Sequence, residues 1–208
     1  MLHVETVEPR TLSLLETLIA LPELKDFHLV GGTALSLQYG HRTSVDLELF
    51  CINRFDNEFI KSTLQNKFGL QFEYESGFSK FGIFCYINGV KVDLVHYPHP
   101  IIGNLFEDDG IRMYDAKDIA AMKIQAILGR GKRKDFWDIA TLSGKYSVKE
   151  MINFHKAKFP SQQLLVSIPQ ALTYFADAEE SEDPVSLKGQ TWETVKKTIQ
   201  QKVNDYLK

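Results

Sequence analysis

The segment VDLELFCI, which begins at Val45, constrains the fold of this chain more than any other stretch of the sequence. Its apolar residues Val45, Leu47 and Leu49 alternate with the acidic residues Asp46 and Glu48. Alternation with a period of two residues is typical of a β-strand that buries one face and leaves the other face polar. We therefore expect a sheet whose polar face carries two carboxylates from a single strand.

Strand-type patterns are confined to residues 27–97, whereas helical periodicity dominates the chain after them. The pair Asn88-Gly89, between two of these strand-type runs, is a strong signal for a β-hairpin. The separation favours an α+β fold, with a mixed sheet flanked by helices in residues 1–110 and a helical domain in residues 111–208 packed against it. The expected strands are 27–30, 45–52, 70–76, 81–87 and 90–97, and the expected helices are 8–21, 34–39, 54–69, 115–131 and 132–144, followed by helical segments up to residue 208.

The composition restricts the classes of protein to which this chain can belong. It has 208 residues, enough to bury a core of its own, and a formal net charge of -3. A charge this close to neutral gives no overall attraction for nucleic acid, so any surface for nucleic acid must be a local patch. Cys51 and Cys85 lie in apolar runs without zinc-type spacing, which indicates free, buried thiols. The sequence has no secretory signal and no apolar run near the roughly 18 residues of a membrane helix, so we expect a cytoplasmic protein without a membrane partner.

Three acidic residues are expected to meet on the polar face of the sheet. Asp46 and Glu48 point to the same side of their strand, with Cα atoms about 7 Å apart. Asp93 follows the same rule in the run VKVDLV, where it projects opposite the apolar residues. Carboxylates held side by side repel each other unless a cation lies between them, and Mg²⁺ prefers such oxygen ligands. If the two strands are neighbours, the sequence predicts a site for one or two Mg²⁺ ions; the alternative is three solvated acids on an exposed sheet face.

A glycine pair precedes the acidic strand along the chain. Gly31 and Gly32 follow the β-type run FHLV, and Thr33 is expected to cap the helix that Gly40 ends. Glycine lets a ligand approach the backbone, and the free N–H groups at a helix N-terminus attract phosphate oxygens. The pair therefore indicates either a phosphate-binding turn or an ordinary turn between strand and helix.

The order of these motifs resembles the nucleotidyltransferase signature of the DNA polymerase β superfamily. The stretch LVGGTALSLQYGHRTSVDLELF is most similar to the AbiEii/AbiGii family of abortive-infection toxins, and the similarity continues through DIAAMKIQAILGRGKRKDFWDIATL to the C-terminal part. The resemblance implies a nucleotidyltransferase-type core in which Asp46, Glu48 and Asp93 bind Mg²⁺. The turn Gly31-Gly32-Thr33 would bind the phosphates of an NTP substrate. The family usually has aspartate at the position of Glu48, so the longer side chain is a departure that bears on activity.

The resemblance also implies roles for residues around the acids. Lys123 interrupts an apolar helix and is expected to contact the triphosphate, with Asp135 acting near the site as a base or as a partner of the lysine. Arg42 is expected to hold a carboxylate or a phosphate, and Ser44 is expected to contact the nucleotide. The densest basic segment, residues 130–134, is interpreted as a largely solvated stripe and is the candidate contact for an RNA acceptor.

The leading hypothesis is an enzyme that transfers a nucleoside monophosphate from an NTP to an acceptor and releases pyrophosphate. By resemblance the acceptor would be RNA, such as the tRNA 3′ end, and the protein would be a growth-arresting toxin neutralised by a separate antitoxin. Two alternatives remain open: transfer to a small hydroxyl compound, as in aminoglycoside nucleotidyltransferases, and a degenerate nucleotide-binding module without catalysis. A basic groove leading from the acids would favour RNA, whereas a closed acidic pocket would favour a cationic small molecule.

Overall fold

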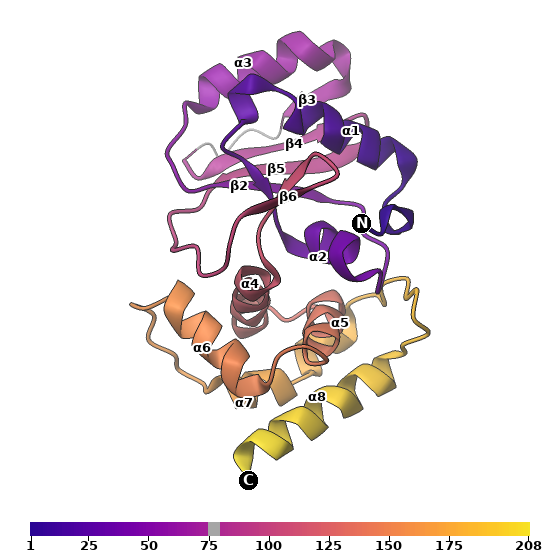
Figure 1. Ribbon diagram of the computed structural model, residues 1–208, viewed down its shortest axis with the longest axis vertical. Coiled ribbons are helices and arrows are strands. Elements are labelled where there is room, and N and C mark those ends of the chain that lie inside the picture. The colour runs from indigo at the N-terminus through magenta and orange to yellow at the C-terminus, as the bar shows by residue number, and fades with distance from the viewer. Residues whose placement is uncertain (75–79) are drawn as a thin grey trace.

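The chain divides into a sheet-containing part and a helical part, in the order that the sequence predicts (Figure 1). The computed structural model describes residues 1–74 and 80–208. Its strands are β1 (His28–Leu29), β2 (Leu47–Cys51), β3 (Phe72–Tyr74), β4 (Gly82–Ile87), β5 (Val90–His96), β6 (Phe106–Asp108) and β7 (Ile111–Met113). Its α-helices are α1 (Pro9–Ile19), α2 (Gly31–Tyr39), α3 (Asn57–Phe68), α4 (Ala116–Gly129), α5 (Arg133–Leu142), α6 (Val148–Lys158), α7 (Ile168–Thr173) and α8 (Trp192–Leu207), and short 3₁₀ turns lie at Val4–Thr6, Pro22–Leu24, Gly69–Gln71 and Ala176–Glu180.

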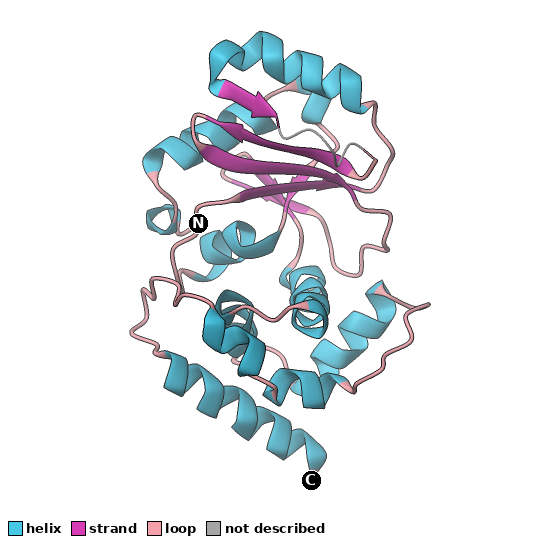
Figure 2. Cartoon of the chain, turned by 180° about the vertical axis from the view of Figure 1, so that it is seen from behind, coloured by secondary structure: helices cyan, strands magenta, loops and turns pink. Residues whose placement is uncertain are grey.

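The strands form one mixed, seven-stranded sheet in the order β3-β4-β5-β2-β1-β7-β6. Strand β2 runs parallel to β5, and β4 is joined to β5 by the predicted hairpin turn, in which Asn88 and Gly89 have φ angles of 53° and 74°. Helices α1 and α3 lie on one face of the sheet, and α2 and α4 lie on the other (Figure 1). The strands occupy one end of the molecule and the last helices the other (Figure 2). The predicted α+β class, with a mixed sheet flanked by helices and followed by a helical half, is confirmed.

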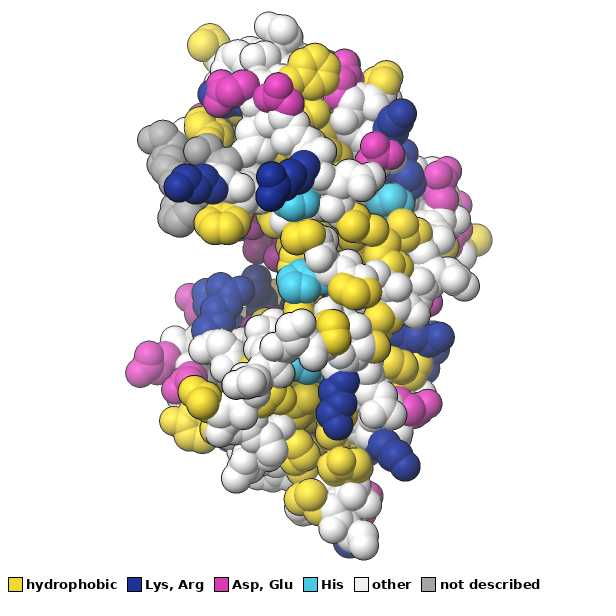
Figure 3. Space-filling view, turned by 90° about the vertical axis from the view of Figure 1, so that its left-hand side faces the viewer, with side chains coloured by type: hydrophobic (Ala, Val, Ile, Leu, Met, Phe, Trp, Pro, Cys, Tyr) yellow, Lys and Arg dark blue, Asp and Glu magenta, His cyan; other side chains and the backbone are white. Residues whose placement is uncertain are grey.

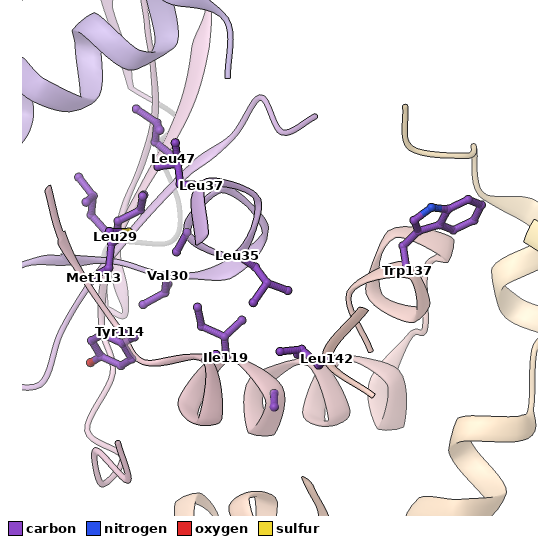
Figure 4. Close-up of a cluster of buried hydrophobic side chains, with 14 of the residues drawn as sticks. Leu29, Val30, Leu35, Leu37, Leu47, Met113, Tyr114, Ile119, Trp137 and Leu142 are labelled. Carbon is purple, nitrogen blue, oxygen red and sulfur yellow. The ribbon is translucent and has the colours of Figure 1, made fainter. Parts of the chain in front are cut away.

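A continuous apolar core joins the sheet to the helices beneath it. Leu29 of β1, Leu47 of β2, Leu35 of α2 and Ile119 of α4 each have 0% of their surface exposed. Figure 4 shows these side chains gathered between the strands and the two helices. Full burial of an aliphatic side chain stabilises a fold by about 1.5–3 kcal/mol. This packing therefore holds α2 and α4 against the strands.

Two short strands escape the pattern-based prediction. Strands β6 and β7 form a hairpin whose turn residues, Asp109 and Gly110, have φ angles of 48° and 75°. Each strand has three residues, which is too few to show alternation, and β7 is held in the sheet by parallel pairing with β1. The expectation that strands end near residue 97 is therefore wrong. The division into domains 1–110 and 111–208 stays a prediction, and this hairpin spans it.

The acidic strand is shorter than the alternation indicates. Strand β2 begins at Leu47, and Val45 is 57% exposed instead of buried. The backbone of the residue before it, Ser44, donates instead to the carbonyl oxygen of Thr6 at 2.9 Å, which draws the chain away from the sheet. As a result Asp46 lies in the loop that leads into β2, one residue before the strand.

Two other boundaries also differ from the expectation. Helix α2 begins at Gly31, so Thr33 lies inside the helix and does not cap it. The extended residue Val30 occupies the N-cap position. The expected strand 70–76 is a strand only at β3, and its last two residues lie outside the described part of the chain.

The helical part follows the predicted periodicity. The Asp115 side chain caps α4 by accepting the N–H of Lys117 at 2.8 Å. Phe136 and Trp137 are each 1% exposed, and the Trp137 ring stacks on Trp192 of α8 with centroids 5.8 Å apart. These aromatic residues belong to the core, as expected. Within the described ranges, no helix combines the length and the apolar character needed to cross a membrane.

A buried ion pair ties the segment after β5 to the helical part. The side chains of Asp118 in α4 and Lys158 in α6 are fully buried, and Nζ of the lysine lies 2.7 Å from Oδ1 of the aspartate. The same carboxylate accepts the backbone N–H groups of Ile102 and Gly103 at 3.1 and 2.7 Å. Asp118 therefore holds the connection between β5 and β6 against α4.

We expect Asp118→Ala to lower the free energy of unfolding by about 3–5 kcal/mol, because it leaves Lys158 as an unpaired charge in the interior. Urea denaturation followed by circular dichroism measures this loss. Asp205→Ala, which removes an exposed ion pair with Lys208, is the matched control and should change stability by less than about 1 kcal/mol. Equal losses in the two variants would contradict the role given to Asp118.

Candidate active site

The acidic residues that the sequence predicts to meet lie near one another on the sheet face that is directed at α4 and α5. In the parallel pairing of β2 with β5, Glu48 is the register partner of Asp93, so their side chains leave the sheet side by side. Asp46 precedes them in the loop before β2. Figure 3 shows a deep notch between the sheet and the helices, with acidic side chains on its upper wall and Lys or Arg side chains on its lower wall.

Two of the three acids are paired with lysines. Lys134 of α5 places Nζ 3.4 Å from Oδ2 of Asp46, and Lys91 places Nζ 2.6 Å from Oδ2 of Asp93. The other oxygen of Asp93, Oδ1, is buried and has no hydrogen-bond partner among the described residues. A buried carboxylate oxygen is costly unless something satisfies it. Asp93 is therefore suited to bind a cation or a proton through Oδ1.

The three acidic side chains do not form a complete set of metal ligands in this arrangement. In residues 1–74 and 80–208, no group of three or more His, Cys, Asp or Glu side chains is arranged to hold a metal ion. Glu48 and Asp93 are adjacent, whereas Asp46 is drawn towards Lys134. Joint binding of Mg²⁺ by the three acids stays a prediction.

Each glycine of the pair makes room for a charged side chain of the protein itself. Gly31 has a φ of 68°, and a Cβ atom there would lie 1.6 Å from Oε2 of Glu48. A Cβ atom on Gly32, whose φ is not in the left-handed region, would lie 2.4 Å from a terminal nitrogen of Arg42. The glycines are thus required for the positions of Glu48 and Arg42 at the N-terminus of α2. Direct phosphate binding by this turn stays a prediction.

Thr33 and Ser44 link the first turn of α2 to the loop before β2. The Thr33 hydroxyl donates to Oγ of Ser44 at 2.8 Å and also contacts the backbone carbonyl oxygen of Asp46. The hydroxyl therefore points at the loop, which explains why it does not cap the helix. Both residues fix the backbone on which Asp46 is carried.

A buried cluster of charges lies behind the acids. Asp138 accepts two hydrogen bonds from the guanidinium of Arg42, at 2.7 and 2.9 Å, and Nε2 of His41 lies 2.8 Å from its Oδ1. Lys123 places Nζ 2.7 Å from Oδ2 of Asp138 and 2.9 Å from Oδ1 of Asp135. The side chains of all five residues are at most 9% exposed. Asp135 and Asp138 thus hold the basic residues in place, which is one of the two roles expected for Asp135.

Electrostatic attraction within this cluster outweighs the cost of burial. Burial alone would raise the pKa of Asp138, but the nearby Arg42 and Lys123 and the hydrogen bonds hold that pKa well below its usual range. For Lys123, burial opposes ionisation, yet the two carboxylates raise its pKa above the ordinary lysine value. Both groups are therefore charged at neutral pH.

Two adjoining cavities open between the acids and the helical part. The inner cavity, of about 100 Å³, is lined by every predicted site residue except Thr33 and Asp93. The outer cavity, of about 710 Å³, shares Asp46 with the inner one. It is bordered by residues of the segment 177–185, which carries four carboxylates facing this space: Asp177, Glu180, Glu182 and Asp183.

Of Lys132 and Arg133, which the sequence indicates to be solvated, Arg133 is instead paired with acidic residues. Arg133 pairs with Glu179 at 3.0 Å and with Asp183 at 2.7 Å, so its charge is neutralised by the acidic segment. Its guanidinium also lies over the ring of Trp192. Lys132 is exposed, as expected. The sequence did not reveal this pairing because segment 177–185 is far from Arg133 along the chain.

Two functional positions were not assigned from the sequence. Lys134, which reaches Asp46, lies one helical position before Asp135 and could have been recognised by its place in α5. His41, which contacts Asp138, directly precedes Arg42 in the HRTS turn. No periodic signal connects that turn with α5, because the two are brought together only by the packing of α2 against α5.

Comparisons with known proteins bear on the family and the fold of this chain. Residues 13–205 match the model of a family described as the nucleotidyl transferase AbiEii toxin of type IV toxin–antitoxin systems. An uncharacterized protein of Aquifex aeolicus (strain VF5) is 33% identical over 201 residues, which cover 93% of this chain and 94% of that protein.

Solved structures share the fold at low sequence identity. The nucleotidyltransferase toxin MenT4 from Mycobacterium tuberculosis H37Rv superimposes with a TM-score of 0.56 at 14% identity, covering 94% of this chain and 82% of that chain. A Helicobacter pylori protein, provisionally described as a nucleotidyltransferase, also gives 0.56 at 14% identity, covering 97% and 99%. At these identities the likeness concerns the fold alone.

We expect Asp138→Asn to lower the free energy of unfolding by about 3–5 kcal/mol at pH 7, because Arg42 and Lys123 lose their shared counter-charge. The folded pKa of Asp138 lies below its unfolded value, so its stabilisation is present above the unfolded pKa of about 3.9 and disappears as the pH falls below it. The gap between wild type and variant should therefore shrink below about pH 4.

Urea denaturation at a series of pH values tests this expectation. Asp177→Asn removes an exposed carboxylate of the same type and serves as the control. A stability gap for Asp138→Asn that stays constant from neutral to acid pH would show that the carboxylate charge is not what holds the cluster.

Proposed function

Because the chain belongs to the AbiEii nucleotidyl transferase toxin family, and is therefore a nucleotidyltransferase, we propose a specific reaction for its cleft. The enzyme transfers a nucleoside monophosphate from an NTP to the terminal hydroxyl of an RNA acceptor. It depends on Mg²⁺, and Asp46, Glu48 and Asp93 are the residues that bind the metal. As a toxin it acts on cellular RNA in the cytoplasm, and a separate antitoxin counteracts it.

One observation carries this proposal: carboxylates and cations face each other across a single narrow cavity. Asp46 and Glu48 line this cavity from the sheet side, with Asp93 beside Glu48 in the parallel register. Lys123 and Lys134 line it from α4 and α5. Phosphoryl transfer requires this combination, because the phosphates are anionic and the attacking and leaving oxygens develop charge. When bound, Mg²⁺ neutralises that charge and orients the phosphates.

The protein residues divide the remaining tasks among themselves. Lys123, held by Asp135 and Asp138, keeps a fixed positive charge at the floor of the cavity for the triphosphate. Arg42 adds a second fixed charge beside Gly32. Because the two aspartates fix these cations in advance, little reorganisation is required when the substrate binds.

The transfer step has a consistent balance of atoms. The acceptor hydroxyl oxygen forms a bond to the α-phosphorus, the bond from the α-phosphorus to the bridging oxygen breaks, and pyrophosphate leaves with the electron pair. The hydroxyl proton passes to the carboxylate of Asp93, which lies beside Glu48. Ser44, on the wall of the cavity, contacts the nucleotide.

A small hydroxyl compound is the second candidate acceptor. The observation in its favour is the outer cavity, whose acidic border of Asp177, Glu180, Glu182 and Asp183 would attract a cationic molecule. The two candidates are separated by whether label from an NTP enters RNA or an aminoglycoside-type compound.

We expect Asp46→Asn and Asp93→Asn each to reduce transfer by at least about a hundredfold, because each removes a charge needed at the reacting phosphate. The measurement is incorporation of radiolabel from each of the four NTPs into total RNA. Asp205→Asn on α8 is the matched control and should retain wild-type transfer. Near-normal labelling by either cleft variant would remove that residue from the proposed site.

Glu48→Asp tests the departure from the usual family pattern. If Glu48 is a functioning ligand, the shorter acid should hold or improve the affinity for Mg²⁺, since the register with Asp93 is unchanged. Calorimetric titration of Mg²⁺ in the presence of NTP measures this affinity. If neither form binds Mg²⁺, the proposed metal dependence is wrong.

A further inference from the structure

A separate pocket lies where β4 begins and β5 ends. It encloses about 660 Å³, and we call it the strand-end pocket; the residues that matter for its chemistry are Arg54, Lys80, Phe81, His96, Tyr97 and His99. It includes none of the residues assigned to the inner or the outer cavity.

The strand-end pocket adjoins the active site along one face of the sheet. Glu48 lines the inner cavity, its register partner is Asp93, and Val95 is two residues further along β5. Side chains two residues apart lie on the same face, about 7 Å from each other. Val95 lines the strand-end pocket, so the line of side chains from Glu48 through Asp93 ends inside it. Figure 3 shows His and Lys or Arg side chains on the surface beside the notch.

The pocket carries cations and aromatic rings. Arg54 and Lys80 are exposed and form no ion pair with any described residue. No carboxylate is found among the described residues that line the pocket. The outer cavity, on the other side of Asp46, is lined by both carboxylates and cations, so its charge is mixed. A polyanion is therefore attracted more strongly to the strand-end pocket than to the outer cavity.

Aromatic rings give the strand-end pocket a second means of binding a nucleic acid, in addition to its cations. The Phe81 side chain is 69% exposed at the rim of the pocket, where its ring is open to stacking by a ligand. The rings of Tyr97 and His99 are 4.5 Å apart between centroids. Burial, together with the nearby charge of Lys158, lowers the pKa of His99, so its ring is a neutral stacking surface at physiological pH. Cations interleaved with rings are the combination that binds single-stranded nucleic acid.

We propose that the strand-end pocket binds the last nucleotides of a single-stranded RNA acceptor and directs its terminal hydroxyl at Asp93. Arg54 and Lys80 contact backbone phosphates, and Phe81 stacks on a base. This proposal rests on the proposed function for the transfer reaction, and adds the route by which the acceptor reaches it. It adds a second RNA contact to segment 130–134, in which Arg133 is already neutralised by Glu179 and Asp183.

The test compares two double variants of equal charge change. Arg54→Ala/Lys80→Ala removes the cations of the pocket, and Lys197→Ala/Lys202→Ala removes two exposed lysines of α8 as the control. The probe is a short, unstructured, fluorescein-labelled oligoribonucleotide, and its binding is followed by anisotropy over a range of salt concentrations. The pocket variant should bind at least about tenfold more weakly, with a log–log salt slope smaller by about 1.4, because each lost phosphate contact in a single strand contributes about 0.7. The α8 variant should behave as wild type.

A second pair of variants tests the stacking surface without changing charge. Phe81→Ala should weaken oligonucleotide binding by about fivefold to a hundredfold and leave the salt slope unchanged. Phe59→Ala, which removes another exposed ring from α3 outside the pocket, is its control. In labelling assays, both pocket variants should raise the KM for RNA, while NTP binding measured without RNA is retained.

The outcomes separate this proposal from the proposed function. If wild type labels RNA but the Arg54/Lys80 variant keeps the wild-type KM and salt slope, or shifts no more than the α8 control, the route through the strand-end pocket is wrong. If wild type labels no RNA, the proposed acceptor class fails, and the pocket is judged by anisotropy alone. Binding lost only in the pocket variants then supports it as an RNA site, and unchanged binding overturns it.

Discussion

The buried contact between Arg42 and Asp138 is the interaction on which the rest of the site depends. It joins the turn after α2 to α5, and so connects the sheet part to the helical part at the floor of the cleft. Lys123 and His41 converge on the same carboxylate. A buried charge of this kind is tolerable only when it is fully paired. The relative position of the acids on the sheet and the cations on the helices is therefore set by one carboxylate that does not line the inner cavity.

The same cluster decides which cations remain available for ligands. Arg42 and Lys123 are partly neutralised by Asp135 and Asp138, and Arg133 is neutralised by the acidic segment 177–185. The chain has a net charge of -3, so attraction for an anionic acceptor has to come from local, unpaired cations. Arg54 and Lys80 meet that requirement beside the strand that carries Asp93. In the proposed route, an RNA acceptor therefore approaches Asp93 along β5.

The glycine pair shows that the site has little free volume around the N-terminus of α2. A methyl group at either position would collide with a side chain that carries charge, Glu48 in one case and Arg42 in the other. Glycine is thus needed here because side chains of the protein itself approach the backbone closely. The longer Glu48 side chain reaches the N-terminus of α2, where the positive end of the helix stabilises a carboxylate. This contact gives a physical setting for glutamate where the family usually has aspartate.

Much of this protein was determined by local sequence alone. The period-two alternation around Leu47 and Val92 predicted β2 and β5, and the Asn88-Gly89 turn predicted the hairpin that joins β4 to β5. Both signals depend only on neighbouring residues. Periodicity likewise predicted α4 and α5, and the spacing of Asp46, Glu48 and Asp93 indicated an acidic sheet face. Strands β6 and β7 were beyond such reasoning, since three residues carry no period and pairing with β1 maintains them.

Tertiary structure alone decided the partners of these residues. Whether Glu48 would lie beside Asp93 depended on β2 and β5 being neighbours in parallel register. The pairing of Arg42 with Asp138, of Arg133 with Asp183, and the opening of the strand-end pocket all join segments that are far apart in the chain. The physical reason is that a residue's type and spacing define what it can bind, whereas long-range packing defines which groups come within bonding distance.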